Sequence, residues 1–266
     1  MSLRRAARVA LVGLVAVTVA ACPGEAAAPL TDPHEIIGRT IDTTSTLRTF
    51  SFRVDVEVRP RVGQVTGGTA DGVVDLANTA FSIRGAANAG NDAFEVILVD
   101  RTLYSRQGQQ QRWTGMGMDV FGPAAIFGPG FGGPGPDVLA ILRELITHQA
   151  TTMETRPVEG CAAGSCYRVN VFVPAEVTWA SLTKAFGFDR FPDAMEMPAD
   201  FPGVAVDVLS DTRTLRLVDL VASASVPNGD SGGIRLQLAD PNGQVTIQAP
   251  PPALVDRFDD FGMSVP

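Results

Sequence analysis

The sequence predicts an α+β fold in which a single antiparallel sheet of about ten strands carries two or three helices on one face. Segments that alternate apolar and polar residues recur along the chain with turn residues between them, which is typical of half-buried strands. A few other segments repeat apolar residues at helical spacing instead. Because an open sheet of this size tends to curl, we expect a curved sheet with the helices on its concave face.

The first 22 residues have the layout of an export signal. Three arginines precede an apolar run over residues 9–21, and small residues lead directly to Cys22. The run is too short for a membrane span, which needs about 20 apolar residues. Bacterial lipoprotein signals place at this point the cysteine that is diacylated and becomes the mature N-terminus. We therefore expect a signal peptide over residues 1–21 and a lipid anchor on Cys22. The alternative is an ordinary secretory signal with an incidental cysteine.

Residues 22–32 are rich in Ala, Pro and Gly and predict a flexible spacer between the anchor and a folded domain over residues 33–266. The whole chain has a net charge of −8, and the signal peptide contains three arginines and no acidic residue. An acidic chain argues against nucleic acid as a partner and against electrostatic binding to anionic lipid. The lipid on Cys22 is therefore expected to hold the protein on the extracytoplasmic face of the plasma membrane.

Two further cysteines, Cys161 and Cys166, enclose four residues. Outside the cytoplasm such a pair predicts a disulfide across a small loop. The alternative is a metal site or a redox role, but a metal site needs more ligands than this pair. The two histidines, His34 and His148, lie far apart in the sequence. We expect no metal and no cofactor.

The first half of the chain predicts a helix followed by a run of strands. Asp32 and Pro33 open a helix over residues 33–48. From Phe50 the period changes to two, which predicts a strand with one apolar and one wet face. A wide apolar stripe over residues 137–148 predicts a helix that covers the apolar face. Further strands are expected over residues 69–76, 80–85, 93–99 and 102–107, with another beginning at residues 112–113.

The second half repeats this pattern. Strands over residues 152–158 and 167–173 flank the cysteine loop as a hairpin, and Pro174 begins a helix that extends to residue 188. A short helix over residues 253–258 is expected to close the chain. The remaining predicted strands cover residues 204–210, 215–225, 234–239 and 244–248, with turn residues between them.

Residues 114–136 have no usable periodicity and contain eight Gly and four Pro among apolar side chains. Gly and Pro disfavour regular structure, yet apolar side chains are costly to leave in water. One interpretation is a poorly ordered insertion. The other is a mobile lid over an apolar cavity, formed by Phe121, Phe127 and Phe131.

The segment around Ser231 resembles the sequence around the nucleophile of chymotrypsin-like proteases. Such a serine needs a histidine base that a carboxylate orients, and neither histidine has a suitable sequence context. The same five residues, 229–233, also make an ordinary hairpin turn. We expect that the protein is not an enzyme. An anchored hydrolase that uses Ser231 ranks below the two non-enzymatic hypotheses given below.

A further pattern is carried by residues 19–22, the early helix, and residues 46–52, 70–76, 99–104, 112–113, 167–171 and 245–250. In these stretches the chain resembles a family of actinobacterial lipoproteins grouped around LppX, LprA, LprF and LprG, which share the half-barrel fold of the lipoprotein carrier LolA. The similarity spans most of residues 33–258 and contains no invariant chemical residue.

The resemblance implies an open half-barrel with an apolar cavity that holds acyl chains and a role in carrying lipids or glycolipids across the cell envelope, between a membrane exporter and an acceptor. A sensor or protein-interaction module on the same fold is the alternative. The residues expected to form the cavity wall are Phe52, Val54, Val56, Phe94, Val96, Leu98, Leu139 and Leu142.

Overall fold

The structure is a computed structural model that describes residues 29–87, 93–117, 143–145, 147–185, 197, 199–227 and 229–257. Two helices and twelve strands have defined bounds within these ranges, and residues 143–145 and 147 are also helical. In chain order the elements are α1 (Pro33–Ser45), β1 (Thr49–Arg59), β2 (Thr66–Asp75), β3 (Ala80–Ala87), β4 (Phe94–Val99), β5 (Thr102–Gln107), β6 (Trp113–Gly117), β7 (Thr152–Cys161), β8 (Gly164–Val173), α3 (Ala175–Ala185), β9 (Val204–Asp211), β10 (Leu217–Ser225), β11 (Ser231–Ala239), the 3₁₀ helix η5 (Pro252–Leu254) and β12 (Val255–Arg257).

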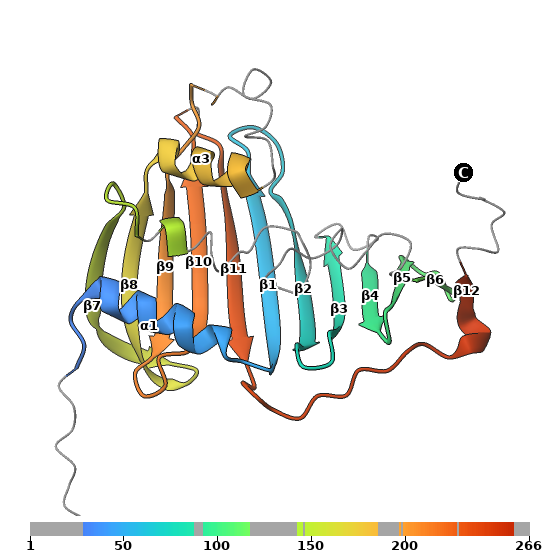
Figure 1. The fold of residues 1–266 in the computed structure, drawn as a ribbon. Coiled ribbons are helices and arrows are strands. Elements are labelled where there is room, and N and C mark those ends of the chain that lie inside the picture. The colour runs from blue at the N-terminus through green and yellow to red at the C-terminus, as the bar shows by residue number, and fades with distance from the viewer. Residues whose placement is uncertain are drawn as a thin grey trace, which may run out of the picture.

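All twelve strands belong to one sheet, in the order β12-β6-β5-β4-β3-β2-β1-β11-β10-β9-β8-β7. Strands β7 and β12 lie at its two edges, and the sheet is open and curved rather than a closed barrel (Figure 1). Neighbouring strands are antiparallel except at one edge, where β12 runs parallel to β6. The α+β class, the single open sheet and the helices on one face are as the alternating sequence predicts.

Helix α1 forms where the sequence places a capping residue before an apolar stripe. The Asp32 side chain accepts a hydrogen bond from the His34 backbone N–H at 2.9 Å, and Pro33 occupies the first turn. The stripe includes Ile36, Ile37 and Ile41, which are buried against β8 and β9. Helix α1 therefore lies across the β7–β10 part of the sheet (Figure 1).

The helix is also fixed by polar contacts with the sheet. Within the apolar contact, the Thr40 hydroxyl lies 2.7 Å from the hydroxyl of the fully buried Ser210. Thr44 accepts a hydrogen bond from the Leu217 backbone N–H at 3.1 Å. These hydrogen bonds satisfy polar groups whose burial would otherwise destabilise the fold. They therefore fix the position of the helix on the sheet.

Two predictions near the C-terminus are wrong. Residues 244–248 were expected to form a strand because Val245 and Ile247 alternate with polar residues, but the structure has no strand there. The segment leaves β11 past the lower end of β1, whose two edges are already paired with β2 and β11, so it finds no ladder partner (Figure 1).

The prediction of a short helix over residues 253–258 is also wrong. Its first part is the 3₁₀ turn η5, and the chain then becomes strand β12. Strand β6 pairs with β5 on one edge and leaves the other edge free. Residues 255–257 occupy that free edge, where Val255 lies opposite Trp113.

Candidate apolar binding face

The strand register assembles one continuous apolar face. In antiparallel neighbours, residues directly opposite each other point to the same side of the sheet. Leu236 of β11 lies opposite Val54 of β1 and also opposite Leu220 of β10, which lies opposite Val208 of β9. Because Val208 packs with α1 in the buried cluster, this is the side that carries the helix, and we call it the inner face.

The same register extends the inner face across the other strands. From β8 to β5 its apolar and small residues include Val169, Val171, Val173, Val206, Val208, Leu220, Ala222, Ile234, Leu236, Leu238, Phe52, Val54, Val56, Val58, Ala70, Gly72, Ile83, Gly85, Phe94, Val96, Leu98 and Leu103.

Six of the residues predicted to line a cavity lie on this face. They come from two strands, β1 with Phe52, Val54 and Val56, and β4 with Phe94, Val96 and Leu98, and the register of the intervening β2 and β3 puts both sets on one side. The other predicted wall residues, Leu139 and Leu142, and the predicted lid residues, Phe121, Phe127 and Phe131, lie outside the described residues. Cys22 also lies outside them.

The inner face has two parts that differ in what lies on them. The covered half consists of β8, β9 and β10, where α1 packs. Val169 is 0% exposed there, and Val171, Val173 and Val208 are buried as well. Leu145, in the helical turn after the predicted lid, packs against the same cluster. The Asp42 carboxylate of α1 binds Arg143 of this turn at 2.6 Å, so both segments lie over the same strands.

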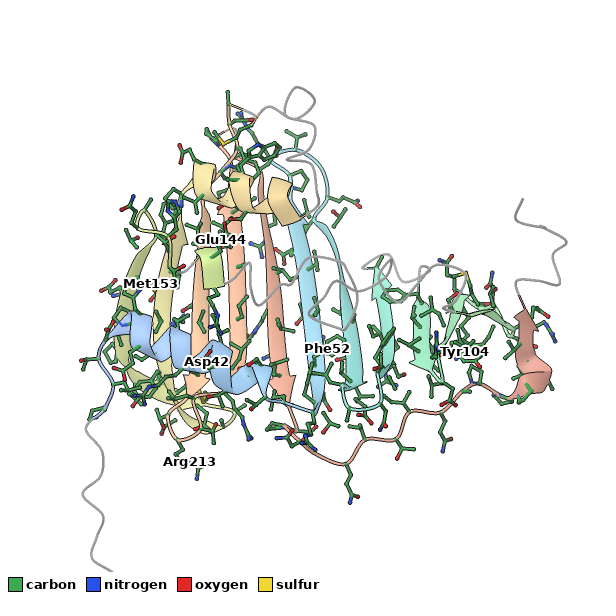
Figure 2. The ribbon with its side chains drawn as sticks, in the orientation of Figure 1. Asp42, Phe52, Tyr104, Glu144, Met153 and Arg213 are labelled. Atoms are coloured by element: carbon green, nitrogen blue, oxygen red, sulfur yellow. A yellow bond between two sulfur atoms is a disulfide. The ribbon has the colours of Figure 1, made fainter. Side chains whose placement is uncertain are left out.

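The open half consists of β11, β1, β2, β3 and β4, which α1 does not cross. Val56 is 41% exposed, Ile234 opposite it is 42% exposed, and Val58 is 47% exposed. Figure 2 shows Phe52 beyond the end of α1, away from the strands that Asp42 overlies. Apolar side chains of the inner face therefore reach solvent at this end of the strands, whereas Val74, Phe81 and Leu98 toward the other end form a second buried cluster.

Two glycines shape the surface of the open half. Gly72 lies opposite Phe52, and a Cβ added there would come within 2.5 Å of the Phe52 ring. Gly85 lies opposite Phe94, and its Cβ would come within 2.6 Å of that ring. Each phenyl ring therefore lies across the neighbouring strand over a glycine, which makes this part of the face flat and apolar. The sequence pattern singles out neither glycine, although each interrupts an apolar strand at an inner-face position.

A small apolar cavity lies between the helices and the covered half. Its volume is about 60 Å³, and its walls come from α1, Leu145 and strands β8 to β10. Small-molecule sites usually measure about 300–1,000 Å³. The space under α1 is therefore too small for an acyl chain.

The outer face of the sheet is charged. Cross-strand ion pairs join Arg53 to Asp71 at 3.4 Å and Arg106 to Glu95 at 2.6 Å. Arg235 binds Asp219 with nitrogen–oxygen distances of 2.5–3.1 Å. These hydrogen bonds raise the pKa of the Arg235 guanidinium. The sheet is thus amphipathic, with water expected on the outer side and apolar contacts on the inner side.

The cysteine pair, Ser231 and His34 lie away from the middle of the inner face or at the ends of its elements. Cys161 and Cys166 are joined by a disulfide at the tip of the β7–β8 hairpin, with Cα atoms 5.9 Å apart. Ser231 is the first residue of β11 and pairs with Ser225 and Arg59 in the ladder rather than standing in the turn. His34 lies at the start of α1.

Within the described ranges, no group of three or more His, Cys, Asp or Glu side chains is placed to hold a metal ion. No helix in that part of the chain has the length and apolar character needed to cross a membrane.

No family model matches the chain, and no curated protein matches it. Solved structures of similar fold include the Mycobacterium tuberculosis lipoprotein LppX, with 15% identity and a TM-score of 0.45 over 81% of this chain and 98% of that chain. LprF from Mycobacterium bovis has 15% identity and a TM-score of 0.47 over 84% of this chain and 98% of that chain.

A LolA superfamily protein from Nitrosomonas europaea has 6% identity and a TM-score of 0.28 over 84% of this chain and 96% of that chain. LppX and LprF are two of the lipoproteins that the sequence resembles. At these identities and TM-scores the similarities carry no information about a ligand.

Proposed function

We propose that this chain is a lipoprotein anchored through Cys22 to the extracytoplasmic face of a bacterial plasma membrane. It binds the acyl part of a lipid or glycolipid on the open half of its inner face and carries it across the cell envelope. The observation that supports this most is the continuous apolar face, whose Val56, Val58 and Ile234 remain 41–47% exposed. Exposed apolar surface of this extent, on a sheet whose other face is charged, is typical of a binding surface.

The chemistry of the open half suits an acyl chain. Burial of an acyl chain contributes about 0.8 kcal/mol per methylene, and no polar partner is needed along its length. The rings of Phe52 and Phe94 lie over Gly72 and Gly85 and offer apolar aromatic surface to a ligand. Binding of this kind is passive, so loading and release depend on a donor, such as a membrane exporter, and an acceptor of comparable apolarity.

The test compares one substitution on the two faces of the sheet. Val56 of β1 points inward and is 41% exposed, whereas Val221 of β10 lies opposite Arg235 on the outer face and is 37% exposed. We expect Val56→Asp to lower the amount of co-purifying lipid per chain at least about tenfold, because a carboxylate in contact with an acyl chain is strongly unfavourable. Val221→Asp, the matched control, should retain the wild-type amount.

The measurement is lipid mass spectrometry of organic extracts from the purified full chain. Both substitutions replace exposed side chains, so each should change the free energy of unfolding by less than about 0.5 kcal/mol. Equal lipid loss in both variants would contradict the assignment to the inner face. A wild-type chain that carries no lipid, even after incubation with envelope lipids, would favour a protein-interaction module instead.

A further inference from the structure

The hairpin loop between β1 and β2 exposes two large apolar side chains to solvent. Val62 is 85% exposed and Val65 is 52% exposed. Single exposed apolar residues are common on soluble proteins, but this loop directly adjoins Val58 of the inner face. Val58, Val56 and Ile234 follow from the loop toward the middle of the open half. Five of the eleven exposed large hydrophobic side chains among the described residues therefore lie in this loop or on the adjoining part of the inner face.

The loop is held in a defined position. The Arg61 backbone N–H donates to the Asp230 carboxylate at 2.6 Å, which ties the loop to the turn between β10 and β11. The aliphatic stem of Arg61 lies over Gly229, where an added Cβ would contact it at 3.6 Å. The apolar tip is thus presented by a braced hairpin at one end of the sheet, at the top in Figure 1.

Two cations flank the tip. The Arg59 guanidinium pairs with Glu57, whereas within the described ranges no hydrogen bond or ion pair involves the Arg61 guanidinium. Because Glu57 and Asp230 offset the two arginines, apolar contact rather than net charge is expected to drive an interaction here. Apolar residues bordered by arginine are typical of segments that lie at a bilayer interface, where the cationic head reaches the phosphate level.

We propose that the loop over residues 60–65 inserts into the surface of a phospholipid bilayer and forms the portal through which an acyl chain passes between the bilayer and the open half. The portal part rests on the proposed lipid binding, whereas insertion does not. An acyl chain that passes Val65 and Val62 on its way to Val58 and Val56 stays in contact with apolar side chains. It therefore avoids the exposure to water that would otherwise limit transfer.

The first experiment locates the loop. The full chain is incorporated in phosphatidylcholine vesicles that contain brominated lipid, and tryptophan quenching is measured for Val62→Trp and, as a control, Val158→Trp. Val158 is 49% exposed on the edge strand β7. We expect quenching and a blue shift for Val62→Trp beyond the signal of the native Trp113 and Trp179, and none for Val158→Trp. No quenching at Val62→Trp, or equal quenching at both positions, would overturn insertion.

The second experiment tests the portal. We expect the double variant Val62→Ser and Val65→Ser to transfer fluorescent lipid between vesicles about tenfold more slowly than wild type, equivalent to about 1.4 kcal/mol, while its bound lipid per chain is unchanged. Val158→Ser should transfer at the wild-type rate. An unchanged rate in the double variant would overturn the portal. A wild-type chain that neither carries nor transfers lipid would reject the proposed function, and Val62→Trp would still report insertion.

Discussion

The covered half and the open half of the inner face are built from the same kind of sequence, yet they have different environments. Val169 on β8 and Val56 on β1 both belong to strands that alternate apolar and polar residues. Val169 is 0% exposed beneath α1, and Val56 is 41% exposed. The alternation therefore determines which side of the sheet is apolar. Whether that side is core or binding surface depends on what packs against it.

The largest effect is expected from one isoleucine substitution made in each half. Ile37 of α1 is 1% exposed and Ile234 of β11 is 42% exposed. Ile37→Ala should lower the free energy of unfolding by about 2–5 kcal/mol, because it leaves a cavity against β8 and β9. Ile234→Ala should cost less than about 1 kcal/mol. Urea unfolding of both variants measures the difference, and equal costs would show that the open half is as well packed as the covered half.

A smaller effect is expected at the glycines under the phenyl rings. Gly85→Ala places a methyl group within 2.6 Å of the Phe94 ring and 2.7 Å of the Thr69 carbonyl oxygen, so both the ring and the neighbouring backbone must shift at a cost of about 1–3 kcal/mol. Gly38 of α1 is the control, because nothing lies within 4 Å of its added Cβ. Gly38→Ala should instead stabilise the helix by about 0.5–1 kcal/mol. Thermal unfolding distinguishes the two signs, and a stabilised Gly85→Ala would contradict the ring placement.

The smallest effect concerns the edge of the sheet beyond the open half, where β12 pairs with β6. Hydrogen bonding to Arg112 lowers the pKa of the Asp256 carboxyl. The bond between these two side chains holds β12 beside β6. A carboxylate whose pKa is lower in the folded state stabilises that state above its unfolded pKa of about 3.9. This stabilisation is lost as the pH falls through the folded pKa, so β12 should loosen below about pH 4.

Hydrogen exchange of residues 255–257 as a function of pH measures this loosening, with the central strand β9 as internal reference. Arg112→Gln should raise the rate of amide hydrogen exchange in β12 already at neutral pH. It should also make that rate less dependent on pH in the acid range. If β12 in this variant responds to pH as the wild type does, the ion pair does not hold the edge.

Much of the fold could be predicted because its signals are local. Strand β5 and the start of β9 begin at the expected residues, and Pro33 begins α1 as the capping pattern predicts. The six cavity-wall residues of β1 and β4 could be placed on one face because a period of two fixes the side on which each side chain lies. Residues 244–248 have the same alternation and form no strand, since a strand also requires a free partner edge.

The two glycines of the open half show what local patterns miss. Gly72 and Gly85 interrupt apolar strands, and propensity alone counts against a strand at each of them. Their role follows from the phenyl ring on the neighbouring strand. The sequence alone does not show which residues of two strands lie opposite each other. The β6–β12 pair is of the same kind, because it joins residues more than 140 positions apart.

The sequence alone therefore determined the class of the fold, the apolar and charged sides of its sheet, and the helix that begins at Pro33, because each depends on residues close together in the chain. Only the tertiary structure decided the strand order, the parallel edge strand and the position of α1. These depend on the register of distant strands and on the polar contacts of Thr40 and Thr44 with the sheet. Because α1 sits over β8 to β10, the apolar face there is core, whereas Val56, Val58 and Ile234 of the same face remain exposed to solvent.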